Sequence, residues 1–490
     1  MSLSAVDYAV IGVYLLAITA FGSWFARYQK TTRDYFLTDR SVPWWAICFT
    51  IVATETSTLT FVGIPAQAYG GNMTFLQLAI GYIIGRVLVS LLFIPAYFRG
   101  ELFTSYELLQ RRFGTRVKTL AAVIFLITRS LADGIRLFTT ALVISVVTQL
   151  PVTAVVIVLG AAMIIYTMRG GVSAVIWTDV VQMFVYVAGA AAVALALVSR
   201  IPGGWPEVVR AGQETGRFVF FDPAVDLTRA YTIWAGLLGG VALTLATHGT
   251  DQFLVQRLLS ARSAKEASRG LILSGFIVFA QFVLFLLIGV MLFAYYQHVP
   301  VPQALSRPDQ ILPIFVVSEL SNGLAGFIVA AIVAAALSPS LNAMAATTVS
   351  DFYLPYVNPS ADQATQMRVS KLATVAWGIV QLAVAIGAQW MERSVLDAGL
   401  AVLSFASGSV LGAFLLGTLA PKVSERDTFF GMVAGLVVMT AVWWGTPVAF
   451  TWYVLIGAVT TCAVAWGFAT MMPRPAPAPS GGGNPSGLPG

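Results

Sequence analysis

The sequence predicts an all-α protein that crosses a membrane many times, and three observations carry that prediction. Hydrophobic residues make up 58% of the 490 residues, and the mean hydropathy is +0.82. Charged residues make up only 10%, whereas a soluble domain carries about 25%. The apolar residues are gathered into stretches of about 20, the length that a helix needs to cross a bilayer.

Thirteen apolar stretches of this kind follow one another along the chain. They are 5–26, 44–70, 75–98, 118–148, 151–168, 175–199, 231–254, 269–297, 323–350, 369–389, 395–419, 427–446 and 450–471.

The basic residues give the stretches an orientation. With the N-terminus outside, the cytoplasmic loops, their edges and the C-terminal tail hold 19 of the 28 Lys and Arg, and the external loops hold six. Short cytoplasmic loops carry an excess of basic residues. We therefore predict thirteen transmembrane helices, with the N-terminus outside and the C-terminus inside.

The second stretch cannot be an ordinary helix. Its middle, 54–60, is a run of small hydroxyl residues that contains Glu55, and Gly63 and Pro65 follow. Unpaired backbone groups are tolerated at membrane depth only where they face protein, water or an ion. The stretch therefore favours a broken helix at a binding site, with a Pro-kinked packing helix as the alternative.

A second interrupted helix is predicted five stretches later. The stretch 231–254 holds three glycines and then the sequence THGTDQ, which includes His248 and Asp251. Paired broken helices in two halves of a chain are typical of inverted-repeat transporters. The odd offset predicts halves of opposite orientation.

The predicted organisation follows from this pairing. It comprises a leading helix and loop (1–42), a first repeat (43–199), an external loop (200–230), a second repeat (231–419), two accessory helices (420–472) and a disordered Pro/Gly-rich tail (473–490).

The composition argues against several other classes of protein. Two histidines and two cysteines offer neither a disulfide framework nor a metal cluster, and no nucleophile–base pair is evident. The net charge of +6 lies mainly in the loops, where it sets topology. We expect no enzyme activity, no organic cofactor and no nucleic-acid partner.

Charged residues inside the stretches are candidates for a solute cavity, because lipid exposure would be expensive. Arg129, Asp133 and Arg136 are spaced to share one face of a helix. They either tie helices together or offer a surplus arginine to a carboxylate solute. Arg86 belongs to the same network or pairs with Glu55. The other cavity candidates are Thr58, Thr60, His248 and Asp251.

Three motifs give the chain a family resemblance. They are GTDQFLVQRLLSARSAKEASRG at 249–270, MRGGVSAVIWTDVVQ at 168–182 and NAMAATTVSDFY at 342–353. With them the chain resembles the sodium/solute symporter family, which includes sugar, proline, pantothenate, monocarboxylate and sialic acid symporters. The resemblance implies a LeuT-type five-plus-five inverted repeat, with one helix before it and two after it.

The resemblance also implies a sodium site between the first and eighth core helices. The carbonyls of Ala53 and Thr56 would contribute, but the expected hydroxyl pair falls on Ala335 and Ala336. Sodium is a hard cation that needs oxygen ligands, so the usual site lacks two of them.

Three compensations for the missing hydroxyls stay open. Glu55 could supply carboxylate oxygens, or sodium could bind at Asp179 and Ser338, which match a second sodium site of some family members. Alternatively, Glu55 or Asp179 could carry a proton as the coupling ion.

The sequence thus predicts a sodium-coupled symporter of a small organic solute, working by alternating access in a bacterial inner membrane. A carboxylate-bearing solute is preferred, followed by a sugar or polyol. The alternative is a proton-coupled symporter or an uncoupled facilitator of the same fold. A monomer is compatible with the sequence, and the oligomeric state stays open.

Overall fold

The computed structural model describes residues 3–28, 31–100, 102–301, 308–336, 340–390 and 395–471. Within these ranges the chain forms helices and no β-strand. The α-helices are α1 (Ala5–Trp24), α2 (Thr32–Leu37), α3 (Trp44–Glu55), α4 (Thr58–Gly70), α5 (Leu76–Leu92), α6 (Ile94–Tyr97), α7 (Tyr106–Arg112), α8 (Thr115–Thr148), α9 (Val152–Arg200), α10 (Gly204–Glu214), α11 (Val241–Gly249), α12 (Gln252–Leu259), α13 (Ala264–His298), α14 (Ile311–Glu319), α15 (Leu324–Ala336), α16 (Leu341–Thr347), α17 (Gln363–Gly387), α18 (Val395–Leu419), α19 (Glu425–Gly445) and α20 (Tyr453–Met471).

Eight of the described helices are long and apolar enough to cross a membrane, and nine if α3 and α4 count as one bent span. One of them, α9, covers two predicted stretches and is interrupted at Gly171, whose φ of 58° is left-handed. The stretches 75–98, 231–254 and 323–350 are each built from consecutive shorter helical segments. The all-helical membrane architecture is confirmed, whereas the count of thirteen spans and their orientation remain predictions.

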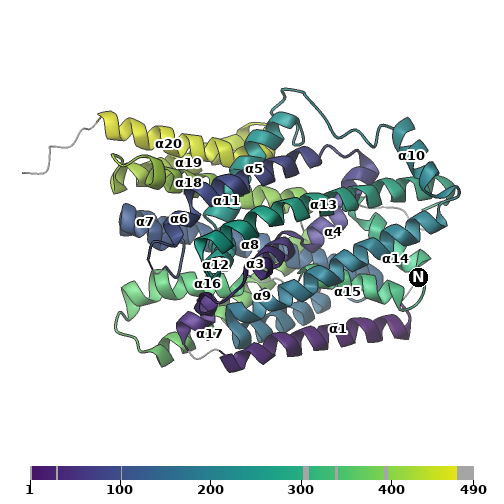
Figure 1. Cartoon of the computed structure of the whole chain (residues 1–490), viewed down its shortest axis with the longest axis horizontal. Helices are drawn as coiled ribbons and strands as arrows, with labels where there is room; N and C mark the ends of the chain where they lie inside the picture. The colour runs from purple at the N-terminus through teal and green to yellow at the C-terminus, as the bar shows by residue number, and fades with distance from the viewer. Residues whose placement is uncertain are drawn as a thin grey trace, which may run out of the picture.

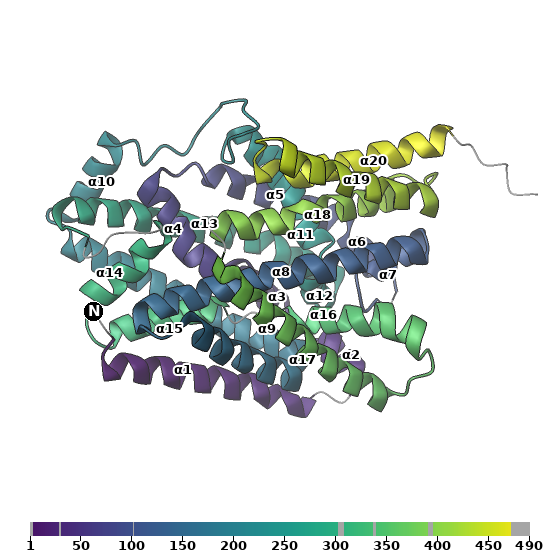
Figure 2. The ribbon, with the colours of Figure 1, turned by 180° about the vertical axis from the view of Figure 1, so that it is seen from behind.

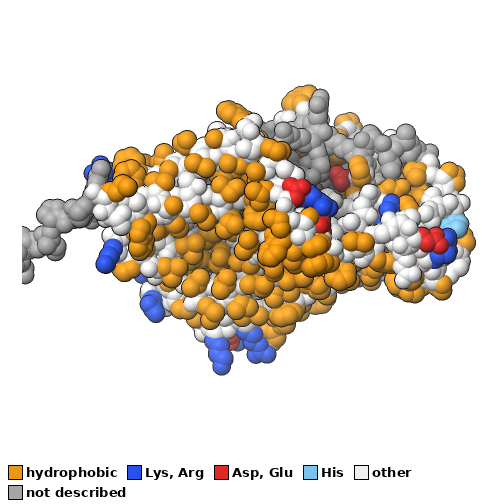
Figure 3. All heavy atoms as spheres, turned by 90° about the horizontal axis from the view of Figure 1, so that it is seen from above, with side chains coloured by type: hydrophobic (Ala, Val, Ile, Leu, Met, Phe, Trp, Pro, Cys, Tyr) orange, Lys and Arg blue, Asp and Glu red, His pale blue; other side chains and the backbone are white. Residues whose placement is uncertain are grey.

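The helices run roughly along one direction (Figures 1 and 2). Helix α1 begins at the end of the bundle where α10 and α14 also lie, and α20 finishes at the other end, on the side of α7. Viewed from above, the middle of the molecule presents a broad expanse of hydrophobic side chains, and most basic side chains lie at its margins (Figure 3). A lipid-facing belt between two polar ends produces this distribution.

The first broken helix consists of α3 and α4, whose axes differ by 57°. Thr56 (φ −82°, ψ 87°) and Ser57 (φ −92°, ψ 172°) leave the helical region between them. Serine and threonine at this point compete with the backbone for hydrogen bonds and favour a helix start. The interruption therefore follows from the predicted run of hydroxyl residues.

The second broken helix begins with a π-helical segment, Ala235–Gly240, and continues through α11 to a break at Thr250–Asp251. Asp251 is the N-cap of α12, and its side chain accepts a hydrogen bond from the Phe253 amide at 2.9 Å. An aspartate N-cap explains why a new helix starts here.

Helix α13 packs against both halves of the first broken helix, α3 and α4. A Cβ on Gly289 would lie 2.1 Å from the Pro65 carbonyl oxygen of α4, and one on Gly270 would lie 2.7 Å from the Trp44 carbonyl oxygen of α3. Small residues let membrane helices approach closely. Glycine at these two positions therefore sets how near α13 comes to the break.

The external connections contain structure that the sequence analysis missed. The loop 200–230 includes α10, whose Glu207 contacts Arg210 and also His298 at the end of α13. Hydrogen bonds from Arg210 and His298 lower the pKa of Glu207 to about 2. The next external connection contains α14, whose residues 311–316 are buried in the protein. The repeat boundaries remain predictions.

Candidate functional site

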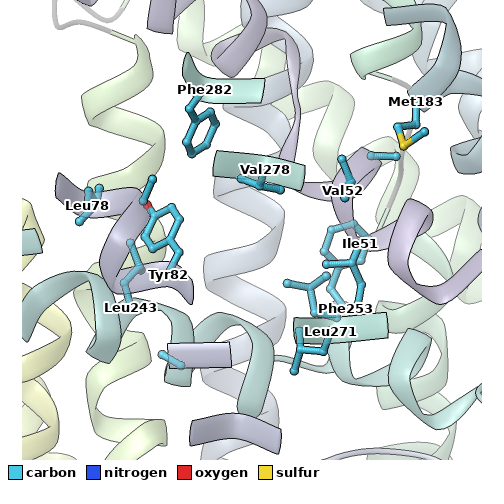
Figure 4. Close-up of a cluster of buried hydrophobic side chains, with 14 of the residues drawn as sticks. Ile51, Val52, Leu78, Tyr82, Met183, Leu243, Phe253, Leu271, Val278 and Phe282 are labelled. Atoms are coloured by element: carbon cyan, nitrogen blue, oxygen red, sulfur yellow. The ribbon is translucent and has the colours of Figure 1, made fainter. Parts of the chain in front are cut away.

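A cavity of about 130 Å³ lies beside the first break. Residues of the break, of α8 and of α11 supply its polar lining, namely Thr54, Glu55, Ser57, Thr60, Arg129, Asp133, Arg136, Thr244, Thr247 and His248. Hydrophobic side chains supply the rest, including Ile64, Phe75, Tyr82, Leu243, Phe253 and Phe282. Four of these, Tyr82, Leu243, Phe253 and Phe282, are seen among the buried side chains in Figure 4. The cavity is thus amphipathic, as small-molecule sites usually are.

Glu55, the last residue of α3, is held by two basic side chains. Its Oε2 contacts Nη2 of Arg86, which is fully buried on α5, and its Oε1 lies 3.1 Å from Nε2 of His248. The Nδ1 of His248 lies 2.9 Å from the Thr247 hydroxyl. A buried carboxylate is stable only when it is paired. Glu55 therefore has its neutralising partner within the protein.

On α8, Arg129 contacts two carboxylates. Its Nη1 lies 3.5 Å from Oδ1 of Asp133, and its Nη2 contacts Oδ2 of Asp251 at the second break. The guanidinium also lies 4.7 Å from the ring centre of Phe253, within the range of a cation–π interaction. Arg129 thus ties α8 to the second broken helix.

Arg136 differs from Arg86, Arg129 and Arg257 in the groups that its guanidinium contacts. Its Nη2 donates a hydrogen bond to the Thr54 carbonyl at 3.2 Å, and its Nη1 has no hydrogen-bond partner among the described residues. Among the described ion pairs, each of the other three intramembrane arginines contacts a carboxylate and Arg136 does not. The side chain is partly exposed and lines the cavity. The guanidinium of Arg136 therefore has no carboxylate within ion-pair distance among the described residues.

Asp179 on α9 lies beside Thr50 of α3 and is not part of the cavity lining. Its Oδ2 accepts hydrogen bonds from the Thr50 hydroxyl at 2.6 Å and from Nη2 of Arg257 at 3.0 Å. Arg257 is 1% exposed and also donates to the Thr50 hydroxyl and to the Phe253 carbonyl. A guanidinium charge therefore already neutralises the Asp179 carboxylate.

The residues expected to form the sodium site between the first and eighth core helices lie around the first break. Ala53 and Thr56 are buried at the end of α3, and the Thr58 hydroxyl donates to the Ile332 carbonyl of α15 at 3.0 Å. That bond brings α15, which ends at Ala335 and Ala336, against the break. Ser338 lies outside the described residues.

The structure brings together most of the predicted cavity residues. Glu55, Thr60, Arg129, Asp133, Arg136 and His248 line the cavity. Arg86 and Asp251 stand behind it as partners of Glu55 and Arg129, whereas Thr58 points to α15 and to Thr140.

Two residues that hold the groups around the cavity were not predicted from the sequence. Arg257 was counted with the cytoplasmic loop residues, but it reaches into the core. Its place in the motif DQFLVQR, six residues after Asp251, was the available signal. Gln281 of α13, whose Nε2 donates to the Thr56 hydroxyl at 2.6 Å, was indicated only as a polar residue in an apolar stretch.

Comparison with known proteins gives similar chains that include several sodium-coupled transporters. A sodium/sialic acid symporter of Proteus mirabilis, SiaT, is 30% identical over 470 residues, with 93% of each chain covered. The human sodium/iodide cotransporter is 31% identical over 447 residues, which cover 88% of this chain and 68% of the relative. The sodium-coupled monocarboxylate transporter 1 of Xenopus laevis is 28% identical, over 88% of this chain and 71% of the relative.

Solved structures agree with this. A substrate-bound, outward-open sodium-coupled sialic acid symporter superposes with a TM-score of 0.89 at 29% identity, covering 96% of this chain and 98% of that one. The transporter Mhp1, of the nucleobase-cation-symport-1 family, shares the fold with a TM-score of 0.57 at 12% identity, covering 90% and 95%. A model of one family matches residues 35–435, which is most of the chain. The protein therefore belongs to the sodium:solute symporter family.

Proposed function

We propose that this symporter couples sodium entry to the import of a small organic carboxylate, which binds to Arg136. Family membership supports sodium-coupled transport. The observation that carries the solute class is the unpaired charge of Arg136 beside the cavity. A guanidinium is the side chain best suited to bind a carboxylate through two parallel hydrogen bonds.

The charges around the cavity support a solute of this kind. Glu55 with Arg86, and Asp179 with Arg257, form neutral pairs. Arg129 is shared between Asp133 and Asp251. Removing a charge from water is costly unless a partner replaces the water. An anionic group on the solute supplies that partner for Arg136, and a neutral sugar does not.

For the coupling ion we propose the region of the first break, between Ala53, Thr56 and the end of α15. The Glu55 carboxylate is a less suitable sodium ligand, because its oxygens face Arg86 and His248. A sodium ion at Asp179 and Ser338 would have to share Asp179 with Arg257. Backbone carbonyls freed by the break are therefore the favoured ligands, as in other transporters with discontinuous helices.

The experiment uses the purified full chain and a panel of small carboxylates. Thermal unfolding is measured in sodium and in potassium at constant ionic strength, since a ligand that binds the folded state stabilises it by RT ln(1 + [L]/Kd). We expect carboxylates to stabilise the wild type only in sodium, and Arg136→Gln to lose that response. Thr139→Val, a buried change on the same helix outside the cavity lining, serves as the control.

Proton coupling is the second candidate, and one observation favours it. The alanine pair at 335–336 leaves the ion site short of hydroxyls, while Glu55 and His248 lie in contact beside the cavity. Stabilisation by carboxylates that is equal in sodium and potassium but changes between pH 6 and pH 8 would support this candidate. It would contradict the sodium-coupled proposal.

A further inference from the structure

Two buried oxygen atoms of the cavity lining have no protein partner among the described residues. One is Oδ2 of Asp133, a side chain that is 7% exposed, and the other is the hydroxyl of Thr244 on α11, which is 1% exposed. Both side chains line the cavity. A buried polar group left without a hydrogen bond is costly, so a bound molecule that meets these atoms gains affinity.

The charge at Asp133 is also incompletely balanced. Arg129 is the basic partner in the described ion pairs of both Asp133 and Asp251, so the three groups together carry one negative charge. Arg136 follows Asp133 by three residues on α8, and side chains at this spacing are neighbours on a helix. This part of α8 therefore presents a negative group beside a positive one.

We propose that Asp133 and Thr244 form a second recognition element, which binds a hydrogen-bond donor carried next to the carboxylate of the solute. The inference rests on the proposed binding of that carboxylate to Arg136. It names the substrate as an α-amino or α-hydroxy carboxylate, and the Asp133 carboxylate, which shares its basic partner with Asp251, favours the ammonium over the hydroxyl. Asp133 is the acceptor, and Thr244 completes the hydrogen bonding of the bound group.

The spacing of the polar groups on such a solute matches the neighbouring positions of Arg136 and Asp133 in the cavity lining. Its two polar groups sit on adjacent carbons, so a single molecule can face both Arg136 and Asp133. The rest of the solute would lie against Phe75, Tyr82 and Phe282 of the cavity. An unsubstituted carboxylate would fill the same space but leave Oδ2 of Asp133 unpaired, and sites built to bind a donor reject analogues that lack it.

The test uses matched ligands that share a carbon skeleton. One set is 4-methylpentanoate, its 2-hydroxy derivative and leucine, and another is 3-phenylpropanoate, 3-phenyllactate and phenylalanine. Dissociation constants are measured in sodium on the full-length wild type, Asp133→Asn and Thr244→Val. Thr139→Val, whose hydroxyl donates to the Ile135 carbonyl of its own helix, is the control.

We expect the wild type to bind at least one α-substituted member more than about tenfold tighter than its unsubstituted partner. Asp133→Asn should reduce the advantage of the ammonium over the hydroxyl. Thr244→Val should weaken the substituted ligands and leave the unsubstituted ones unchanged. Thr244→Val replaces a hydroxyl without a protein partner by a methyl group of similar size. This variant therefore still tests the inference if Asp133→Asn does not fold.

Equal affinities across each set in the wild type would overturn the inference, and so would a preference that both variants retain. In that case carboxylates would still bind in an Arg136-dependent manner, and the proposed function would stand. If no carboxylate binds and Arg136→Gln changes nothing, the proposed function fails together with the inference.

Discussion

The chain interrupts two of its helices, and the two interruptions are built differently. At the second break, protein groups meet the freed backbone: the Ser105 hydroxyl donates to the Thr250 carbonyl at 3.0 Å, the Tyr97 hydroxyl donates to the Gly249 carbonyl, and Asp251 caps the next helix. At the first break, the groups that donate to the backbone carbonyls of Thr54 and Glu55 come from Arg136 and Thr60, which themselves line the cavity. Ser57 makes no capping hydrogen bond through its side chain and also lines the cavity.

The difference separates an anchor from a binding site. A discontinuous helix builds a site only where its freed groups face a cavity, because elsewhere those groups must be satisfied by the protein itself. The second break positions Arg129 through Asp251, while its neighbours Thr247 and His248 line the cavity. The first break places Ser57, one of the residues of the break itself, in the cavity lining. Variants at the two breaks should therefore separate stability from transport.

The largest effect is expected at the anchor. Arg129→Leu leaves Asp133 and Asp251 without their shared cation, and removing one partner of a buried ion pair costs about 3–5 kcal/mol. We expect a strongly lowered melting temperature and a low yield of folded protein. Adding Asp251→Asn to Arg129→Leu should recover part of the loss. A melting temperature unchanged by Arg129→Leu would show that the pair does not hold the second break.

A smaller effect is expected at the first break. Thr56→Val removes the hydroxyl that accepts a hydrogen bond from Gln281, and a buried donor left unpaired costs about 1–3 kcal/mol. Replacing both partners, in Thr56→Val with Gln281→Leu, should return the melting temperature towards that of the wild type. If the double variant is as unstable as the sum of the two single variants, the hydrogen bond is not what stabilises this break.

The smallest effects come from a matched pair of serines. Ser105→Ala removes the hydrogen bond to the Thr250 carbonyl and should lower the free energy of unfolding by about 1 kcal/mol. It should leave the affinity for the solute unchanged. Ser57→Ala should barely change stability and should alter sodium-driven uptake. The reverse pattern would exchange the roles that we assign to the two breaks.

Much of the fold could be predicted from the sequence, because its signals are local. Stretches of apolar residues indicate spans, and the hydroxyl run with Glu55 and the sequence THGTDQ indicate the two breaks. Family membership was predicted from motifs and is confirmed by the match over residues 35–435. The helix α10 was missed, because it lies in a polar loop without an apolar stretch to mark it.

The pairing of charges could be predicted only in part. The common face of Arg129, Asp133 and Arg136 follows from their spacing, and the pairing of Arg86 with Glu55 was one of two open alternatives. Which arginine stays unpaired depends on distant residues, since Asp251 reaches Arg129 from another helix and Arg257 reaches Asp179. No local pattern in the sequence encodes those contacts.

The central claim is that the unpaired charge of Arg136 selects a carboxylate, and one comparison tests it most directly. The affinities of a carboxylate and of its primary amide, which has a similar shape without the charge, are measured in sodium on wild type and Arg136→Gln. We predict that the wild type prefers the carboxylate by about 100-fold, which corresponds to about 3 kcal/mol, and that Arg136→Gln binds the two alike. A preference for the carboxylate that persists in Arg136→Gln would contradict the account.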